Sequence, residues 1–264
     1  MTEDELREAC KLYLEKIVQR SNSLEKIKEI EHDTRGQHEN PRWQELRKDC
    51  LTASNFGVVV KRRTSTSCHN LIKRLLYSQE IHENVAIQKY ENQFNVKIEK
   101  CGLFIDSNNF LGASPDGLIG TNGLVEIKCL PSIGVNPIKD SATSTTCFEI
   151  KDGNVQLKKN HNYYFQVQGQ LNITGREYCD FVIFTENDFH VEKMFVDRHF
   201  WQETMLPKLK LFFINCMLPE IVNARIPRGL KVRDPSYITE AKHKQKTNKH
   251  IKCFCFIYYL KIKI

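Results

Sequence analysis

The chain has 264 residues, a formal net charge of +7 and ordinary globular composition, with 41% hydrophobic and 27% charged residues, enough for one well-buried domain with appendages. No run approaches the roughly 18 apolar residues of a membrane span, and the N-terminal segment is charged, so we expect a soluble, intracellular protein without membrane contact. The 10 cysteines form no C-x-x-C pair, which argues against a zinc finger or a dense disulfide framework.

Helical patterns dominate the first hundred residues. Residues 3–31 have apolar side chains at helical spacing and predict one or two helices, which end at the polar, turn-rich residues 32–41. Further helices are expected near 43–47, over 70–77 and over 83–94. Glu83, at the start of the last of these, could simply lie on the exposed face of an amphipathic helix.

Short apolar runs separated by Asn, Gly and Asp turns predict a β-rich centre. Asn122-Gly123 favours a tight hairpin between Leu118 and Leu124, and Asp152-Gly153 favours another. The runs lie at residues 100–106, 109–114, 117–120, 123–129 and 147–157.

The second half alternates helix and strand. A helix is expected from about 160 to 173, ending at Gly175, and strands at 179–186 and 190–196 precede a final helix over 199–217. This order predicts an α/β fold in which a central mixed β-sheet is flanked by helices.

The C-terminal residues carry the basic charge. Residues 223–264 contain 11 Lys and Arg against 2 Asp and Glu, so they hold +9 and leave −2 on the rest. This composition favours a disordered basic tail that could contact phosphates nonspecifically. We therefore divide the chain into an N-terminal helical extension at 1–40, a main domain at 41–222 and this tail.

The stretch GASPDGLIGTNGLVEIKCL places charged residues in an otherwise apolar segment. Side chains alternate between the faces of a strand, so Glu126 and Lys128 share one face and their apolar neighbours the other. A hairpin through Asn122-Gly123 would bring Asp116 beside Glu126. These residues therefore form a candidate site.

The candidate site suits metal-dependent hydrolysis. Two adjacent carboxylates resist joint ionisation unless a cation lies between them, and hard oxygen ligands favour Mg²⁺ or Mn²⁺. Lys128 is a compact charge that can hold an attacking water or neutralise an oxyanion. The combination is typical of phosphodiester hydrolysis.

Three further motifs accompany the SPDG turn and the EIK strand. They are W-x-x-L-R-x-x-x-L-T-A-S (Trp43–Ser54), E-x-x-A-x-x-x-Y (Glu83–Tyr90) and YYFQVQGQL (Tyr163–Leu171). SPDG followed by EIK is similar to the PD-(D/E)xK nuclease signature. Taken in order, the motifs resemble the YqaJ-type viral recombinase and lambda exonuclease family over about residues 43–203.

The resemblance implies roles for individual residues. It makes Asp116 and Glu126 metal ligands and Lys128 the catalytic lysine. Glu83 becomes a further acidic residue of the site, and Gln166 helps to place the nucleophilic water. The implied cofactor is Mg²⁺, with Mn²⁺ as an alternative, and two ions are expected.

The resemblance also implies a substrate pocket. Arg47, Ser54 and Ser114 match positions that hold the terminal 5′ phosphate of DNA, so duplex DNA ends are the expected partner. A family member forms a ring-shaped trimer around DNA, which leaves a homo-oligomer open, although no interface signature is present in the sequence. In a eukaryote, the nucleus would be the compatible compartment.

Each of these residues also has an ordinary structural interpretation. Asp116 could be a turn residue, because Pro-Asp-Gly is good turn chemistry. Glu126 and Lys128 could form a solvent-facing stripe on an edge strand. Gln166 and Gln170, one helical turn apart, could hydrogen-bond only to water, and Arg47 could be a surface cation.

The expected function is that of a divalent-metal-dependent DNA exonuclease of the recombination and repair type, in the PD-(D/E)xK nuclease fold. Two alternatives remain open at this point. One is a catalytically inactive DNA-binding module derived from a mobile element. The other is an endonuclease that uses the same site, since only the recognition of DNA ends differs.

Overall fold

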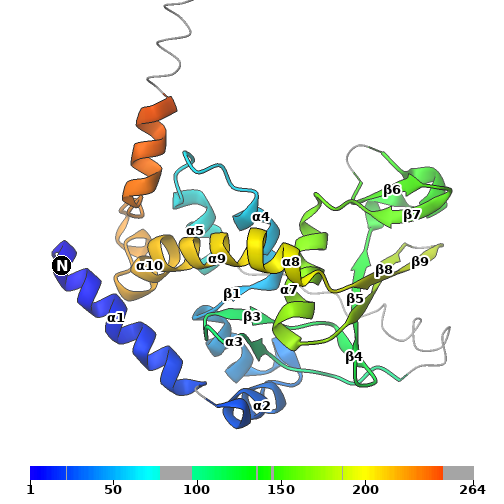
Figure 1. Ribbon diagram of the computed structural model, residues 1–264, viewed down its shortest axis with the longest axis horizontal. Helices are drawn as coiled ribbons and strands as arrows, with labels where there is room; N and C mark the ends of the chain where they lie inside the picture. The colour runs from blue at the N-terminus through cyan, green and yellow to red at the C-terminus, as the bar shows by residue number, and fades with distance from the viewer. Residues whose placement is uncertain (22, 78–96, 135, 144–145, 186, 246–264) are drawn as a thin grey trace, which may run out of the picture.

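A computed structural model of the chain describes all residues except 22, 78–96, 135, 144–145, 186 and 246–264. Helices make up one half of the molecule and the largest sheet lies in the other half, with helix α7 between them (Figure 1). The predicted fold class, an α/β fold with mixed sheet flanked by helices, is confirmed, although the strands are divided among three sheets. The predicted helix over 83–94, which carries Glu83, lies outside the described residues.

The helices agree well with the predicted ones. The two helices at the N-terminus begin at capping residues: Thr2 forms a reciprocal capping box with Glu5, and the Ser23 hydroxyl accepts a hydrogen bond from Lys26 N–H. The helices labelled in Figure 1 are α1 (Glu3–Arg20), α2 (Leu24–Asp33), α3 (Pro41–Lys48), α4 (Phe56–Val60), α5 (His69–Tyr77), α7 (Asn162–Thr174), α8 (Arg198–Phe200), α9 (Leu206–Phe212) and α10 (Leu218–Val222).

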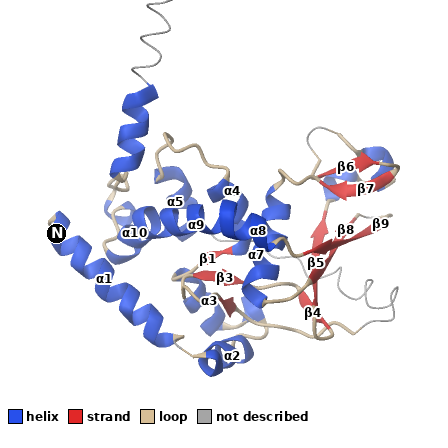
Figure 2. Cartoon of the chain, viewed as in Figure 1, coloured by secondary structure: helices blue, strands red, loops and turns tan. Residues whose placement is uncertain are grey.

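The strands form a small sheet in the order β1-β3-β2, a larger one in the order β4-β5-β8-β9, and the separate hairpin β6-β7. Figure 2 shows the larger sheet apart from most of the helices. The strands are β1 (Leu51–Thr52), β2 (Phe104–Ile105), β3 (Leu111–Ala113), β4 (Gly117–Ile119), β5 (Gly123–Cys129), β6 (Phe148–Lys151), β7 (Asn154–Leu157), β8 (Tyr178–Phe184) and β9 (Phe189–Phe195).

Both predicted hairpins are confirmed. Leu118 faces Leu124 across the β4–β5 pair, and the β6–β7 turn holds Asp152 and Gly153 at φ of 51° and 77°, as a turn with two left-handed residues requires. Strand β5 runs antiparallel to β4 and parallel to β8. A parallel pair needs a long crossover, and here the chain between β5 and β8 contains the β6–β7 hairpin and α7.

Helix α7 is buried along almost its whole length, from Tyr164 to Leu171. It ends at Gly175, which has φ of 73°, a left-handed conformation that suits glycine. A Cβ at Gly169 would lie 2.3 Å from a ring carbon of Phe56, so this glycine lets α7 approach α4 closely. The helix therefore has buried positions on every side, and its polar residues need partners inside the protein.

The predicted final helix is a single rod in which α-helical segments alternate without a gap with two π-helical turns, Trp201–Met205 and Phe213–Met217. Each π turn comes directly before an α-helical segment that has a proline in its first turn, Pro207 in α9 and Pro219 in α10. Proline has no N–H to donate to the preceding turn. The wider π turn places each proline at the start of a new α-helical segment. The rod therefore continues through both prolines although each lacks an N–H donor.

The C-terminal segment corrects the prediction that residues 223–264 form a disordered tail. Asp234 accepts hydrogen bonds from the N–H of Cys68, at 2.9 Å, and from the hydroxyl of Ser67, also at 2.9 Å. Ile238 is fully buried in the helical core. The prediction is wrong for residues 223–245, because a buried isoleucine and a hydrogen-bonded aspartate dock this segment despite its basic side chains.

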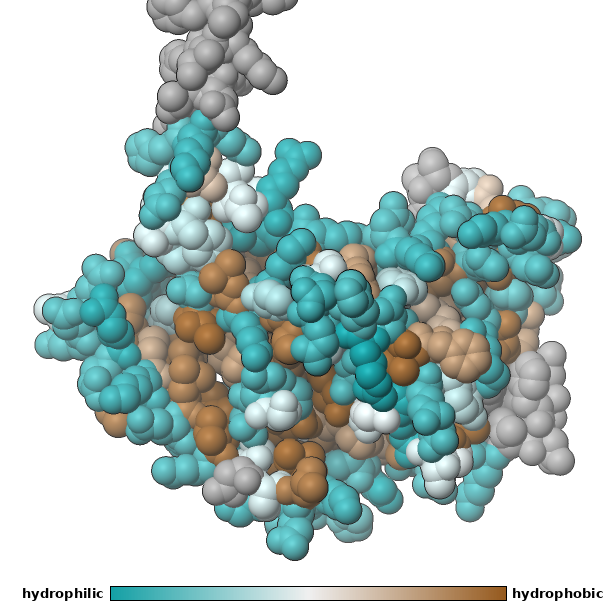
Figure 3. Space-filling view, viewed as in Figure 1, coloured by the Kyte–Doolittle hydropathy of each residue, from teal (hydrophilic) through white to brown (hydrophobic). Residues whose placement is uncertain are grey.

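The surface is mixed in character. Figure 3 shows polar side chains over much of one face, with apolar ones gathered between α1 and the body of the protein. Among the described residues, no helix has the length and apolar character needed to cross a membrane.

Candidate active site

One open pocket of about 160 Å³ brings the predicted site residues together. It is lined by residues from four separate parts of the chain: Gln37, His38, Trp43, Arg47, Thr52, Ala53, Ser54, Ser114, Asp116, Glu126, Lys128, Gln166 and Gln170. Seven of the eight predicted site residues are in this lining. The eighth, Glu83, lies outside the described residues.

The β4–β5 hairpin sets Asp116 beside Glu126. Gly117 faces Val125 in the register, so the residue before Gly117 lies next to the residue after Val125. Asp116 Oδ2 accepts a hydrogen bond from the N–H of Ile127 at 2.7 Å, which ties the turn to the neighbouring strand. Asp116 is therefore fixed across the hairpin and points its carboxylate at the pocket.

The interpretation of Glu126 and Lys128 as a solvent-facing stripe on an edge strand is wrong. Strand β5 lies inside its sheet, between β4 and β8. The Glu126 side chain is 2% exposed and that of Lys128 is 21% exposed, and their Oε1 and Nζ atoms are 2.6 Å apart. A charged pair buried in this way is held for a purpose other than solubility.

Both oxygens of Glu126 accept hydrogen bonds from glutamines of α7. Gln166 Nε2 donates to Oε1 at 2.5 Å, and Gln170 Nε2 donates to Oε2 at 2.7 Å. The two glutamines are one helical turn apart and therefore share a face of α7. Gln166 thus bonds directly to a predicted metal ligand rather than only to water.

The pKa values in the site reflect crowded charge. Burial raises the pKa of Asp116, and repulsion from the Glu126 carboxylate raises it further, to about 7. Burial lowers the pKa of Lys128, but attraction to Glu126 and Asp116 outweighs burial and leaves that pKa above its ordinary value. Lys128 is therefore charged at neutral pH, while Asp116 holds a proton part of the time unless a cation neutralises the pair.

These residues fit a divalent cation. The two carboxylates are hard oxygen donors, and burial and mutual repulsion keep the pKa of Asp116 raised although Lys128 lowers it, so a further cation would favour the ionised pair. Within the described part of the chain, no group of three or more His, Cys, Asp and Glu side chains could hold a metal. Two carboxylates with the remaining positions left to water and phosphate oxygens are typical of Mg²⁺ sites.

The other predicted residues, Arg47, Ser54 and Ser114, also line the pocket. The Arg47 guanidinium stacks on the Trp43 ring, 4.0 Å from its centroid, and Trp43 Nε1 donates to Ser114 Oγ at 2.9 Å. The Ser54 hydroxyl lies 3.2 Å from that of Thr52. Contact with the ring restricts the guanidinium, so Arg47 is more constrained than a solvated surface cation.

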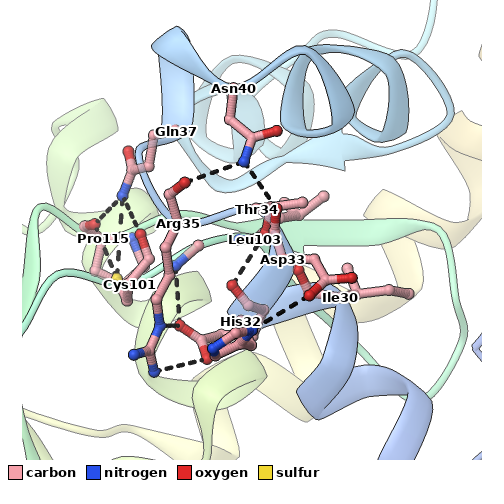
Figure 4. A network of polar contacts seen from close by, with 12 residues as sticks. Ile30, His32, Asp33, Thr34, Arg35, Gln37, Asn40, Cys101, Leu103 and Pro115 are labelled. Atoms are coloured by element: carbon pink, nitrogen blue, oxygen red, sulfur yellow. Dashed lines mark hydrogen bonds and ion pairs between the residues drawn. The ribbon is translucent and has the colours of Figure 1, made fainter.

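Gln37 and His38, in the turn-rich segment 32–41, reach the pocket although no sequence pattern predicts it. Figure 4 shows Gln37 reaching to the carbonyls of Cys101 and Pro115, which its Nε2 atom approaches to 3.1 and 2.7 Å. His38 follows it into the lining. Gln37 has φ of 46°, a left-handed conformation set by tertiary contacts rather than by local sequence. The predicted N-terminal extension is thus part of the site.

The segment that carries Gln37 is anchored by polar contacts with the core (Figure 4). The hydroxyl of Thr34 accepts from the N–H of Leu103 at 2.8 Å, and Asn40 Nδ2 donates to the carbonyls of Asp33 and Arg35. Gln170 was expected only to hydrogen-bond to water, but it lies one turn from Gln166, lines the pocket and donates to Glu126.

Comparison with known proteins gives both a sequence match and structural matches. The family model of the YqaJ-like viral recombinase domain matches residues 42–177, just over half of the chain. Among curated protein sequences, no significant match is found.

The structural matches are to exonucleases. The alkaline exonuclease of Laribacter hongkongensis in complex with dAMP is 24% identical, with a TM-score of 0.50, and the match covers 71% of this chain and 96% of that one. Another structure of that enzyme gives 23% identity and a TM-score of 0.49 with the same coverage. The shutoff and exonuclease protein of Kaposi's sarcoma associated herpesvirus is 14% identical, with a TM-score of 0.43, covering 80% of this chain and 75% of that one.

Proposed function

The chain belongs to the family of YqaJ-like viral recombinase domains, and on that premise we propose that it is a divalent-metal-dependent exonuclease that hydrolyses phosphodiester bonds from duplex DNA ends. The observation that carries the proposal is the single pocket that joins two carboxylates and a charged lysine to an arginine and two serines. The complex of the Laribacter enzyme with dAMP supports a nucleotide ligand for this chain as well.

Asp116 and Glu126 would hold the cation. Mg²⁺, for which Mn²⁺ can substitute, supplies Lewis acidity toward the phosphoryl oxygens and a more acidic bound water. The protein orients the ligands beforehand: the N–H of Ile127 fixes Asp116, and Gln166 fixes Glu126. Preorganised ligands avoid the reorganisation that would otherwise raise the barrier.

Lys128 acts as a positive donor rather than as a base. Its pKa is raised by Glu126 and Asp116 against the effect of burial, so it keeps its proton at neutral pH. A charged ammonium can orient the attacking water and stabilise negative charge on the phosphate as the bond to the leaving oxygen breaks. Gln166 lies beside it and would help to place the same water.

Arg47, Ser54 and Ser114 would hold the terminal 5′ phosphate. An arginine fork and two hydroxyls suit an anion with several free oxygens. A terminal phosphate carries nearly two charges and three free oxygens, whereas a phosphate within the chain carries one charge and two ester links. The pocket would therefore favour ends and set the adjacent bond near Asp116.

The test compares blunt linear duplexes of one sequence with 5′-phosphate or 5′-hydroxyl ends, at subsaturating protein and with Mg²⁺. We expect faster degradation of the phosphorylated duplex, and Arg47→Ala should erase most of the difference. Arg42→Ala is the matched control, because Arg42 lies on the same helix but pairs with Asp33 outside the pocket.

The same experiment distinguishes the alternatives. Equal rates on both ends, or ready cutting of closed circular DNA, would indicate an endonuclease that uses the same site. DNA binding without hydrolysis under any divalent cation would indicate a noncatalytic DNA-binding module.

A further inference from the structure

Helix α7 presents a second glutamine to the site, in addition to Gln166, for which the resemblance implied a role. Gln170 is 1% exposed, and its Nε2 atom donates to Glu126 Oε2 at 2.7 Å. A carboxylate only accepts hydrogen bonds, so the amide of Gln170 must turn its NH₂ toward Glu126. Its carbonyl oxygen is thereby turned away from Glu126.

That carbonyl oxygen is buried and, among the described residues, has no hydrogen-bond donor. Buried side-chain acceptors are nearly always satisfied by protein or by ordered water. An unsatisfied buried acceptor costs free energy. The amide keeps this orientation despite that cost, so its hydrogen bond to Glu126 determines how the Gln170 side chain is turned.

The two oxygens of the Glu126 carboxylate have different partners. Oε1 is shared by Lys128 and Gln166, whereas Gln170 is the donor to Oε2. Loss of Gln166 would leave Oε1 with the lysine, but loss of Gln170 would leave Oε2 without that donor inside the protein. Gln170 thus controls the orientation of the carboxylate to a degree that Gln166 does not.

We propose that Gln170 is a positioning residue that fixes the Glu126 carboxylate through its NH₂ group. The inference rests on the proposed function, because it concerns the same cation site. Gln170 itself does not contact the reacting atoms and acts through Glu126.

The test compares two substitutions on one helix. Gln170→Met keeps length and helix propensity but removes the donor and the acceptor. Gln168→Met is the matched control, because Gln168 is also 1% exposed but bonds outside the pocket, to the Phe195 carbonyl and the N–H of Asp197. Mn²⁺ binding is measured by electron paramagnetic resonance on the full chain, and hydrolysis of linear duplex is measured alongside.

We expect Gln170→Met to weaken Mn²⁺ binding about tenfold, as is usual when a partner of a metal ligand is lost, while Gln168→Met binds Mn²⁺ like the wild type. Unchanged binding in Gln170→Met, or equal weakening in both variants, would overturn the inference. If the wild type binds Mn²⁺ but hydrolyses no DNA, the proposed function fails, and the binding comparison still decides the role of Gln170.

Gln170→Leu covers the case in which the methionine variant does not fold. Leucine is also apolar and cannot donate to Glu126 at any pH. We expect the rate at saturating Mg²⁺ to fall about tenfold or more, with the fold confirmed by circular dichroism. A wild-type rate in this variant would refute the positioning role.

Discussion

At the scale of single residues, Asp116 shows how burial and a neighbouring carboxylate disfavour the ionised form of a carboxyl group. Its carboxylate accepts one backbone hydrogen bond, yet burial and the Glu126 carboxylate raise its pKa to about 7. A carboxyl with a raised pKa binds a proton on folding between its ordinary pKa and the raised one. This proton uptake adds to the free energy of unfolding in full below the ordinary carboxyl pKa, and the addition is lost as the pH rises toward 7.

We therefore predict that the metal-free protein loses stability between about pH 4 and pH 7, with a slope from this group of at most about 1.4 kcal/mol per pH unit. Asp116→Asn should flatten the profile and abolish hydrolysis. Urea unfolding in EDTA at several pH values measures the slopes. Parallel profiles for wild type and variant would show that Asp116 titrates normally, and saturating Mg²⁺ should flatten the wild-type profile.

Lys128 permits a separate test of charge stabilisation. We predict that Lys128→Ala lowers the hydrolysis rate about 100-fold or more at saturating Mg²⁺ while Mn²⁺ binding is unchanged or slightly tighter, because a competing cation beside Glu126 is gone. Rate measurements over a full Mg²⁺ titration separate the two effects. Complete recovery of the rate at high Mg²⁺ would contradict the proposed role.

Residues of the site differ in how far local sequence determines their position. Asp116, Glu126 and Lys128 could be predicted to converge, because strand alternation and one tight hairpin fix their relation within a dozen residues. Gln37 could not, since its contact with Pro115 joins residues 78 apart in the chain. No periodicity or turn chemistry encodes a contact of that kind.

At the scale of elements, α7 and the loop before α3 both bring polar residues to the site. The existence and bounds of α7 were predictable from its length, its composition and Gly175. Its burial on all sides was not, because burial depends on α4 and the sheet that pack against it. The two π turns of the final rod were likewise not predictable from hydrophobic spacing, which Pro207 only interrupts.

The loop can be tested through Gln37. We predict that Gln37→Leu lowers stability by about 1–2 kcal/mol, since the carbonyls of Cys101 and Pro115 lose a donor, and that it lowers kcat/KM because the turn before Asp116 is freed. Gln44→Leu is the control: Gln44 is exposed and donates to the loop at the His38 carbonyl. Equal effects of the two substitutions on kcat/KM would show that the loop matters only as a whole.

At the scale of the whole molecule, the C-terminal segment is both a structural strap and a source of charge. Residues 223–245 dock on the core through Asp234 and Ile238. Residues 246–264 contain five lysines and no Asp or Glu. The two parts of the segment therefore have separable effects.

We predict that a chain ending at Arg233 is destabilised by about 2–5 kcal/mol, because the site of a buried isoleucine is left empty. A chain ending at residue 245 should keep its fold and its hydrolysis rate at saturating DNA, but its DNA affinity should depend less steeply on salt. Thermal unfolding and filter binding over a salt series measure both effects. An identical salt slope would show that the five lysines do not contact phosphates.

The pocket joins segments that are far apart in the chain, and this determines when it can form during folding. Trp43 bonds to Ser114 across 71 residues, and Gln166 to Glu126 across 40. Contacts of such long sequence separation close late, after local helices and hairpins exist. After dilution from denaturant, helical circular dichroism should therefore return before nuclease activity, and the delay between the two signals measures the time needed to assemble the site.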